Sequence, residues 1–235
     1  IIGSIAHVEM LFKQKIISFQ IKNKIIYGLN KIEKEILNKK FEFNTKYEDI
    51  HINIEKRLFQ IIGEEAGYIH TARSRNDQVI TDFKIWIKSS TKNINLALDK
   101  IIKSSLNLAD KNINTIMPGF THLKNAQPIS FAHYLMAYVE MFNRDKKRFK
   151  NNLDNLNENP LGVAALTGTS FNIDRIYTTK KLGFKKPTNN SIDSVSDRDF
   201  ALDFLSSASI CAMHISRFAE ELIIWNSDIF KLIKI

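Results

Sequence analysis

Two long helical patterns are separated by the stretch Met117-Pro-Gly-Phe-Thr-His-Leu-Lys-Asn-Ala-Gln-Pro128. Pro118 and Pro128 lie near its two ends, and Gly119 gives the backbone freedom at its start. Because proline fixes φ and removes a backbone donor, neither helix is expected to continue through this stretch. We therefore expect a short loop that joins two long helices.

The chain from Asp77 to Met117 contains no glycine and no proline, and its apolar residues recur at helical spacing. A helix of about 35 residues would be about 50 Å long. A second long helix is expected between Pro128 and Asn159, and a third after Ser196, where Ser196 and Asp199 resemble a capping box. Strand-like alternation is not convincing, so the pattern predicts an all-α fold built on a long-helix bundle.

Shorter helices are expected in the first part of the chain. Three hydroxyl residues are placed at helix starts: Ser4, Ser18 and Thr45, the last in the capping-box pattern Thr45-Lys-Tyr-Glu48.

The composition is that of a soluble globular protein, with 44% hydrophobic and 25% charged residues in 235. The single cysteine, Cys211, excludes a disulfide framework and is expected to be a buried structural thiol. Neither a signal-peptide pattern nor an uncharged apolar run of membrane-spanning length is present, so we expect a cytoplasmic location and no membrane partner.

The formal net charge of +9 raises the possibility of a nucleic-acid partner. The lysines, however, are scattered among acidic residues, and no arginine-rich stripe is present. A solvated basic surface is therefore the preferred interpretation, and no nucleic-acid partner is expected.

The segment from His70 to Val79 is densely polar and leads into an apolar helical pattern. Asn76 or Asp77 is a natural cap for that helix. Arginine side chains beside a helix N-terminus favour anions, because guanidinium groups and free backbone N–H groups both bind carboxylate or phosphate. The alternative is a solvated loop with ordinary capping.

Thr121 and His122 lie side by side in the break between the two long helices. Histidine is well suited to proton transfer near neutral pH, and catalytic groups often lie in loops that a rigid scaffold holds. The alternative is that His122 only caps a helix end or bonds a carbonyl. His51, in the first turn of an earlier helix, is a candidate site residue or a plain surface residue.

Three stretches together resemble argininosuccinate lyase, a family of the fumarase and aspartase superfamily that includes delta-crystallins. They are His70–Val79, Pro118–Pro128, and Ser194–Phe200 with the helix that follows it. Glu48–His51 and Gly3-Ser4 also match the pattern of the family's first domain. The sequence Ser74–Gln78 is specific to this family within the superfamily.

The resemblance implies elimination of fumarate from argininosuccinate to give arginine, the last step of arginine biosynthesis. It implies a homotetramer with active sites shared between subunits, a smaller N-terminal helical domain over residues 1–76 and a central bundle over residues 77–235. No cofactor or metal is expected. Another fumarate-releasing lyase, a non-catalytic structural or remnant bundle, and a basic nucleic-acid-binding bundle are the alternatives.

The resemblance also assigns roles to individual residues. His122 would be an acid or base, and Thr121 would bind the substrate beside it. Asn76, Arg75 and Ser74 would hold the succinate portion, and His51 would support the site. The family's loop with a catalytic serine would lie beyond Ile235, and both ends look cut, so we expect this polypeptide alone to be inactive or nearly so.

Overall fold

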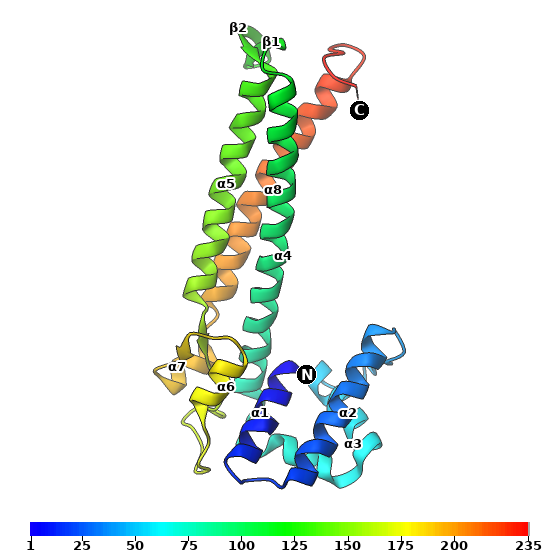
Figure 1. Cartoon of the computed structure of the whole chain (residues 1–235), viewed down its shortest axis with the longest axis vertical. Helices are drawn as coiled ribbons and strands as arrows, with labels where there is room; N and C mark the ends of the chain where they lie inside the picture. The colour runs from blue at the N-terminus through cyan, green and yellow to red at the C-terminus, as the bar shows by residue number, and fades with distance from the viewer. Residues whose placement is uncertain (235) are drawn as a thin grey trace. The chain divides into compact units, whose positions relative to one another are not determined.

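The computed structural model describes residues 1–234 and is mainly helical (Figure 1). In chain order the elements are α1 (Ile2–Lys13), α2 (Phe19–Leu37), α3 (Ile50–Ile62), the 3-10 helix η1 (Gly63–His70), α4 (Arg75–Lys111), β1 (Ile116–Thr121), β2 (Lys124–Ser130), α5 (Phe131–Asn155), β3 (Glu158–Asn159), α6 (Arg175–Lys181), β4 (Lys186–Pro187), α7 (Ser191–Ser196) and α8 (Asp199–Asn226). The three long helices expected from the sequence are present as α4, α5 and α8, and the predicted all-α bundle is confirmed.

The described chain divides into two compact units. Unit 1 comprises residues 1–86 and 157–197, and unit 2 comprises residues 87–156 and 198–234. Helix α4 begins in unit 1 and continues into unit 2. The domain boundary expected after residue 76 stays a prediction.

Unit 1 has a core made by α1, α2, α3 and η1. Its fully buried side chains include Val8, Leu11, Ile25, Leu29, Ile32 and Leu58. Helices α2 and α3 approach each other closely at Gly28, where an added Cβ would lie 2.4 Å from Leu58 Cδ1. The close contact explains why glycine is tolerated in the middle of a helix, where it lowers helix stability.

Helix capping in the first part of the chain agrees with the sequence only in part. Ser18 caps α2 as expected and accepts a hydrogen bond from the Ile21 amide at 3.2 Å. Thr45 does not cap α3; the cap is Asp49, which accepts from the Ile52 amide at 2.7 Å. Ser4 is not a cap either, because α1 begins at Ile2 and leaves Ser4 buried inside the helix.

The predicted cap of α8 is also wrong. Arg198 precedes α8 and makes no side-chain cap bond. Ser196 instead ends α7, and its hydroxyl donates to the Ile192 carbonyl at 3.1 Å. The Ser196 hydroxyl therefore bonds within α7 and does not cap α8.

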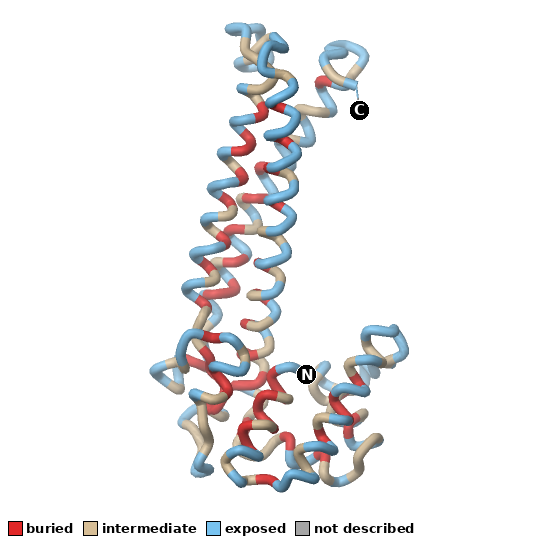
Figure 2. The backbone as a smooth tube through the Cα atoms, viewed as in Figure 1, coloured by how far each residue is buried: buried red, intermediate tan, exposed pale blue. Residues whose placement is uncertain are grey.

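Unit 2 contains the later part of α4 together with α5 and α8. Figure 2 shows buried residues recurring along one side of α5 and α8, as expected of amphipathic helices. Phe142 and Phe149 are fully buried on α5, and the Tyr138 ring lies 4.6 Å from the Phe218 ring of α8. Cys211 is buried, as expected.

The loop expected around residues 117–128 is a β-hairpin instead. Strands β1 and β2 pair antiparallel, with Thr121 opposite Lys124, and His122 and Leu123 form the turn. Both turn residues have positive φ, 51° and 62°, as a type I′ hairpin turn requires. The sequence did not indicate this hairpin, because the Asn-Gly or Asp-Gly pair typical of such a turn is absent.

The two prolines and the glycine of this stretch fit the hairpin geometry. Pro118 lies opposite Pro128, and the register shifts between Pro118 and Phe120. At Gly119 an added Cβ would lie 2.7 Å from the Gln127 carbonyl oxygen. Prolines are tolerated here because each strand of a two-stranded ribbon has a free edge.

Candidate functional site

The first turn of α4 is fixed by a reciprocal pair of hydrogen bonds. The Ser74 hydroxyl accepts from the Asn76 amide at 3.2 Å, and Asp77 Oδ1 accepts from the Ser74 amide at 3.0 Å. This is the arrangement of a capping box, with Ser74 at the cap position. The expectation that Asn76 or Asp77 would be the cap is therefore wrong, although Asp77 supplies the second half of the box.

Asp77 and Asn76 also hold a second segment of unit 1. Asp77 Oδ2 accepts from the Gly162 and Ala164 amides, each at 2.9 Å, and Asn76 Nδ2 donates to the Ala165 carbonyl at 2.9 Å. Asp77 is fully buried, and burial raises its pKa against the lowering effect of the amides that it accepts. The start of α4 is thus joined to a segment about 85 residues later in the chain.

Arg75 is surrounded by acceptors from its own chain. Its Nη1 and Nη2 donate to the two carboxylate oxygens of Glu55 at 2.8 Å and 3.0 Å, and Nη1 also donates to Gln78 at 2.6 Å. Its Nε lies 3.3 Å from Asp49 Oδ2. The guanidinium is therefore held in one orientation by α3 and by the next turn of α4.

Glu55 has a second partner besides Arg75. His70 Nε2 lies 2.8 Å from Glu55 Oε1. Burial alone would raise the pKa of Glu55, but the hydrogen bonds from His70 and Arg75 lower it to about 2. The carboxylate is ionised throughout the neutral range.

His51 lies beside the same network. Its Nδ1 is 3.8 Å from Asp82 Oδ2, and burial lowers its pKa, so the ring is neutral at neutral pH. Asp82 is itself close to α1, since a Cβ added at Gly3 would lie 2.6 Å from Asp82 Oδ1. The structure therefore brings together four predicted site residues in unit 1: Ser74, Arg75, Asn76 and His51.

Two further buried groups lie next to this network, and sequence reasoning did not assign them to the site. Arg73 Nη1 donates to the Ser4 hydroxyl at 2.9 Å, and His7 Nε2 lies 2.8 Å from the Thr71 carbonyl oxygen. Within the described chain, Arg73 Nε and Nη2 and His7 Nδ1 are buried without a hydrogen-bond partner. Burial lowers the pKa of Arg73 to about 10 and that of His7 to about 3.

The other two predicted residues lie in unit 2, at the tip of the hairpin. Thr121 ends β1 and His122 begins the turn, and both are exposed. Among residues 1–234 neither side chain has a hydrogen bond or an ion pair. The alternative that His122 caps a helix end does not hold, because it lies in a β-turn.

The hairpin borders a cavity of about 660 Å³ in unit 2. Thr121, Tyr134, Glu221 and Trp225 are among its lining residues. Tyr134 and Tyr138 both donate to Glu221, with the Tyr138 bond at 2.9 Å, and burial raises the pKa of both phenols. Sequence reasoning missed Glu221, because adjacent glutamates near the end of a helix are typical of a solvated face.

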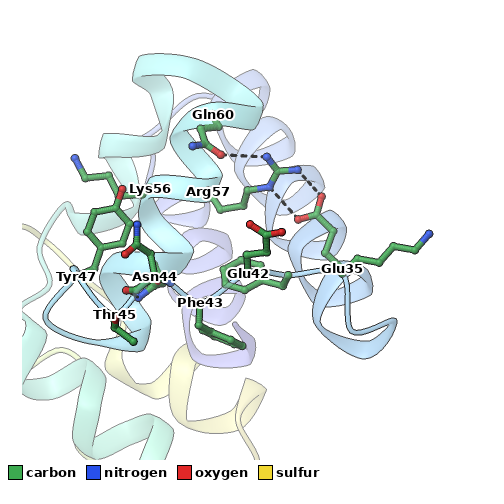
Figure 3. Close-up of a pocket in the computed structure, with 12 residues that line it drawn as sticks. Glu35, Glu42, Phe43, Asn44, Thr45, Tyr47, Lys56, Arg57 and Gln60 are labelled. Atoms are coloured by element: carbon green, nitrogen blue, oxygen red, sulfur yellow. Dashed lines mark hydrogen bonds and ion pairs between the residues drawn. The ribbon is translucent and has the colours of Figure 1, made fainter.

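A second pocket, of about 550 Å³, opens between α2, α3 and the segment that joins them (Figure 3). Arg57 donates to both oxygens of Glu35 at 2.9 Å and 2.8 Å, and to Gln60 at 3.1 Å. None of the predicted site residues lines this pocket. Its central cation is already paired, so the pocket is not a candidate for the active site.

Two further features of the described residues concern metal binding and membrane spanning. Residues 1–234 contain no group of three or more His, Cys, Asp or Glu side chains that could hold a metal ion. None of their helices combines the length and apolar character needed to cross a membrane.

Comparisons with known proteins show which family this chain belongs to. Residues 3–235 match a family model described as lyase. The argininosuccinate lyase of Pelagibacter ubique (strain HTCC1062) is 80% identical over 233 residues, which are 99% of this chain and 50% of that protein. The argininosuccinate lyase of Chelativorans sp. (strain BNC1) is 55% identical over 99% of this chain and 49% of that protein. The chain thus spans about half the length of the curated relatives it matches.

Solved structures agree on the fold. The crystal structure of EDDS lyase in complex with formate superposes with a TM-score of 0.85 at 27% identity, over 98% of this chain and 45% of that chain. A fumarate lyase:delta crystallin from Brucella melitensis bound to cobalt gives 0.82 at 18% identity, over 96% of this chain and 54% of that chain, and supports the fold alone. The resemblance to argininosuccinate lyases is confirmed, and the chain belongs to the lyase family.

Proposed function

We propose that this chain carries part of the active site of an argininosuccinate lyase, which eliminates fumarate from argininosuccinate to give arginine. The observation that carries the proposal is the 80% identity to such a lyase over 99% of this chain. The geometry at the start of α4 supports it, because a capped helix N-terminus with polar side chains suits a dicarboxylate substrate.

The elimination removes a proton from the carbon beside a carboxylate and then breaks the C–N bond. It therefore needs a base that takes this proton, an acid that protonates the guanidino leaving group, and donors aimed at the carboxylate oxygens where negative charge develops. His122 is the proposed acid or base, because its imidazole is exposed and makes no bond that would block proton transfer. Thr121 beside it is the proposed substrate-binding hydroxyl.

Unit 1 supplies the proposed succinate-binding residues. Asn76 and Ser74 lie at the helix N-terminus, where backbone N–H groups favour an anion. Arg75 and the neutral His51 complete the set. We also propose, as parts of the same assignment, a homotetramer with shared active sites, a cytoplasmic location and no metal or cofactor.

The test is fumarate release by the protein isolated from its source, with argininosuccinate and adenylosuccinate offered separately. We expect turnover of argininosuccinate and none of adenylosuccinate. Turnover of adenylosuccinate alone would assign a different lyase of the superfamily. Argininosuccinate binding without turnover would assign a non-catalytic role.

A further inference from the structure

We propose that Glu55 is a positioning residue, which holds Arg75 and His70 and so fixes the turn Ser74–Asn76 for substrate binding; this inference rests on the proposed function. Glu55 lies on α3, and neither the sequence motifs nor the family resemblance assigns it a role. Its effect would be exerted through Arg75 and not through contact with the substrate.

The Glu55 carboxylate fastens both ends of the short connection between η1 and α4. His70 ends η1 and Arg75 begins α4, and both contact Glu55, at 2.8 Å for each of the nearest atom pairs. The residues between them form the bend that leads into α4, and Ala72 there has a positive φ of 57°. A bend with an unfavourable backbone conformation persists only where the surrounding structure holds it.

Most of the hydrogen-bonding capacity of Arg75 is already used by its own chain. A guanidinium has five N–H groups, and Glu55 and Gln78 accept three of them in this structure. Asp49 lies beside a fourth, at Nε. Arg75 therefore ties the start of α4 to α3, and one of its N–H groups remains for a substrate carboxylate.

Glu55 and Arg75 together form a clamp that is rigid and permanently charged. Bidentate arginine–carboxylate pairs fix orientation as well as distance. The Glu55 side chain is 21% exposed, and its pKa of about 2 keeps it ionised at any pH at which the enzyme would work. The clamp also lies directly before Asn76, whose side chain and that of Asp77 hold residues 162–165.

Unit 1 offers a matched control. Glu35 holds Arg57 with the same bidentate geometry, at 2.8 Å and 2.9 Å, and the Glu35 side chain is 18% exposed (Figure 3). That pair joins α2 to α3 and makes no contact with the turn. Replacing either glutamate removes one Arg–Glu pair from the same unit, but only one replacement affects the turn.

The experiment introduces Glu55→Gln and Glu35→Gln separately into the protein as its source makes it. The steady-state kinetics of the two variants with argininosuccinate are then compared. We expect Glu55→Gln to raise KM about tenfold or more, with a smaller fall in kcat, because a misplaced binding group weakens substrate binding first. Glu35→Gln should leave both constants within about twofold. The charge-retaining Glu55→Asp should recover part of the loss and serves if Glu55→Gln does not fold.

Wild-type kinetics in Glu55→Gln, or equal losses in both variants, would overturn the proposal. If the wild-type protein itself shows no turnover, the proposed function fails, and the inference is judged by hydrogen exchange. Faster exchange of the amides of residues 71–78 in Glu55→Gln but not in Glu35→Gln supports the clamp. Unchanged exchange there would overturn it.

Discussion

The turn at Ser74–Asp77 and the hairpin tip at Thr121–Leu123 carry the two sets of proposed site residues, and they are built in opposite ways. In the turn, each of the side chains of Ser74, Arg75, Asn76 and Asp77 bonds to its own chain. At the hairpin tip, the Thr121 and His122 side chains are exposed and bond to nothing in residues 1–234. The chain therefore preorganises one set of groups and leaves the other set available for partners outside it.

The difference has a simple physical origin. The turn combines a local capping box with charge pairs to α3, so its side chains cannot rotate without losing hydrogen bonds. The hairpin is held by backbone pairing between β1 and β2, which leaves the side chains of the turn free. Substitutions in the turn should therefore lower stability, whereas replacing the Thr121 or His122 side chain should leave stability nearly unchanged.

The largest effect is expected at the hairpin tip. Loss of a general acid or base lowers rates by about 10² to 10⁴, so His122→Asn should lower kcat by that factor in the protein isolated from its source. The free energy of unfolding should change by less than about 0.5 kcal/mol, because the side chain is exposed and makes no hydrogen bond within residues 1–234. A variant with full activity, or one that unfolds, would break the comparison.

The next effect concerns the pH dependence of unit 1. His7 has a folded-state pKa of about 3, well below its ordinary value of 6.5, because it is buried. The unfolded chain binds a proton as the pH falls through 6.5, whereas the folded chain does not until about pH 3, so stability falls across that window. Between pH 6.5 and 4.5 the loss is about 2 kcal/mol.

Chemical denaturation at a series of pH values measures this loss. In His7→Gln the pH dependence over that window should become smaller by the same amount, since glutamine does not titrate. Identical pH profiles for the two proteins would show that His7 is not buried in its neutral form.

A third effect is expected from Asp77→Asn. The amide keeps the shape but loses one acceptor oxygen, so a backbone N–H of Ser74, Gly162 or Ala164 remains buried without a partner. An unsatisfied buried donor costs about 1 to 3 kcal/mol. Thr121→Ala is the matched change at the tip and should cost less than about 0.5 kcal/mol. Equal costs for the two would contradict the comparison.

The smallest effect is expected from Leu123→Gly. Leu123 has a φ of 62° and an exposed side chain, and glycine adopts that conformation without strain. The hairpin should gain up to about 1 kcal/mol, partly offset by the greater flexibility of glycine in the unfolded state. Thermal unfolding would detect a higher midpoint. A lower midpoint would show that the Leu123 side chain contributes packing.

The sequence predicted the elements whose signals are local and repeated. Helix α4 was expected from a long stretch without glycine or proline, and it spans 37 residues. The hairpin was missed because its turn uses His122 and Leu123 in place of residues that favour positive φ. The caps expected at Thr45 and Ser196 were wrong because Asp49 caps α3 and the Ser196 hydroxyl bonds within α7.

The candidate-site residues, like the helices, could be proposed where their signal in the sequence is local. The motif around Ser74–Asn76 and the Thr121-His122 pair were proposed as site residues from residue type and from the family resemblance. The supporting roles of Glu55 and Asp77 were not, because they depend on contacts across 20 and 85 residues that no periodicity reveals. Contacts of that kind follow from the tertiary fold alone.

The most direct test of the difference between the two regions is hydrogen exchange of the native protein with and without saturating fumarate, the proposed product. We predict that the hydrogen-bonded amides of Ser74, Asn76 and Gln78 are already protected in the free protein and change little when fumarate is added. Amides of residues 122–124 should exchange fast in the free protein and become protected. Protection of residues 74–78 that appears only with fumarate would show that the turn is not preorganised and would contradict this account.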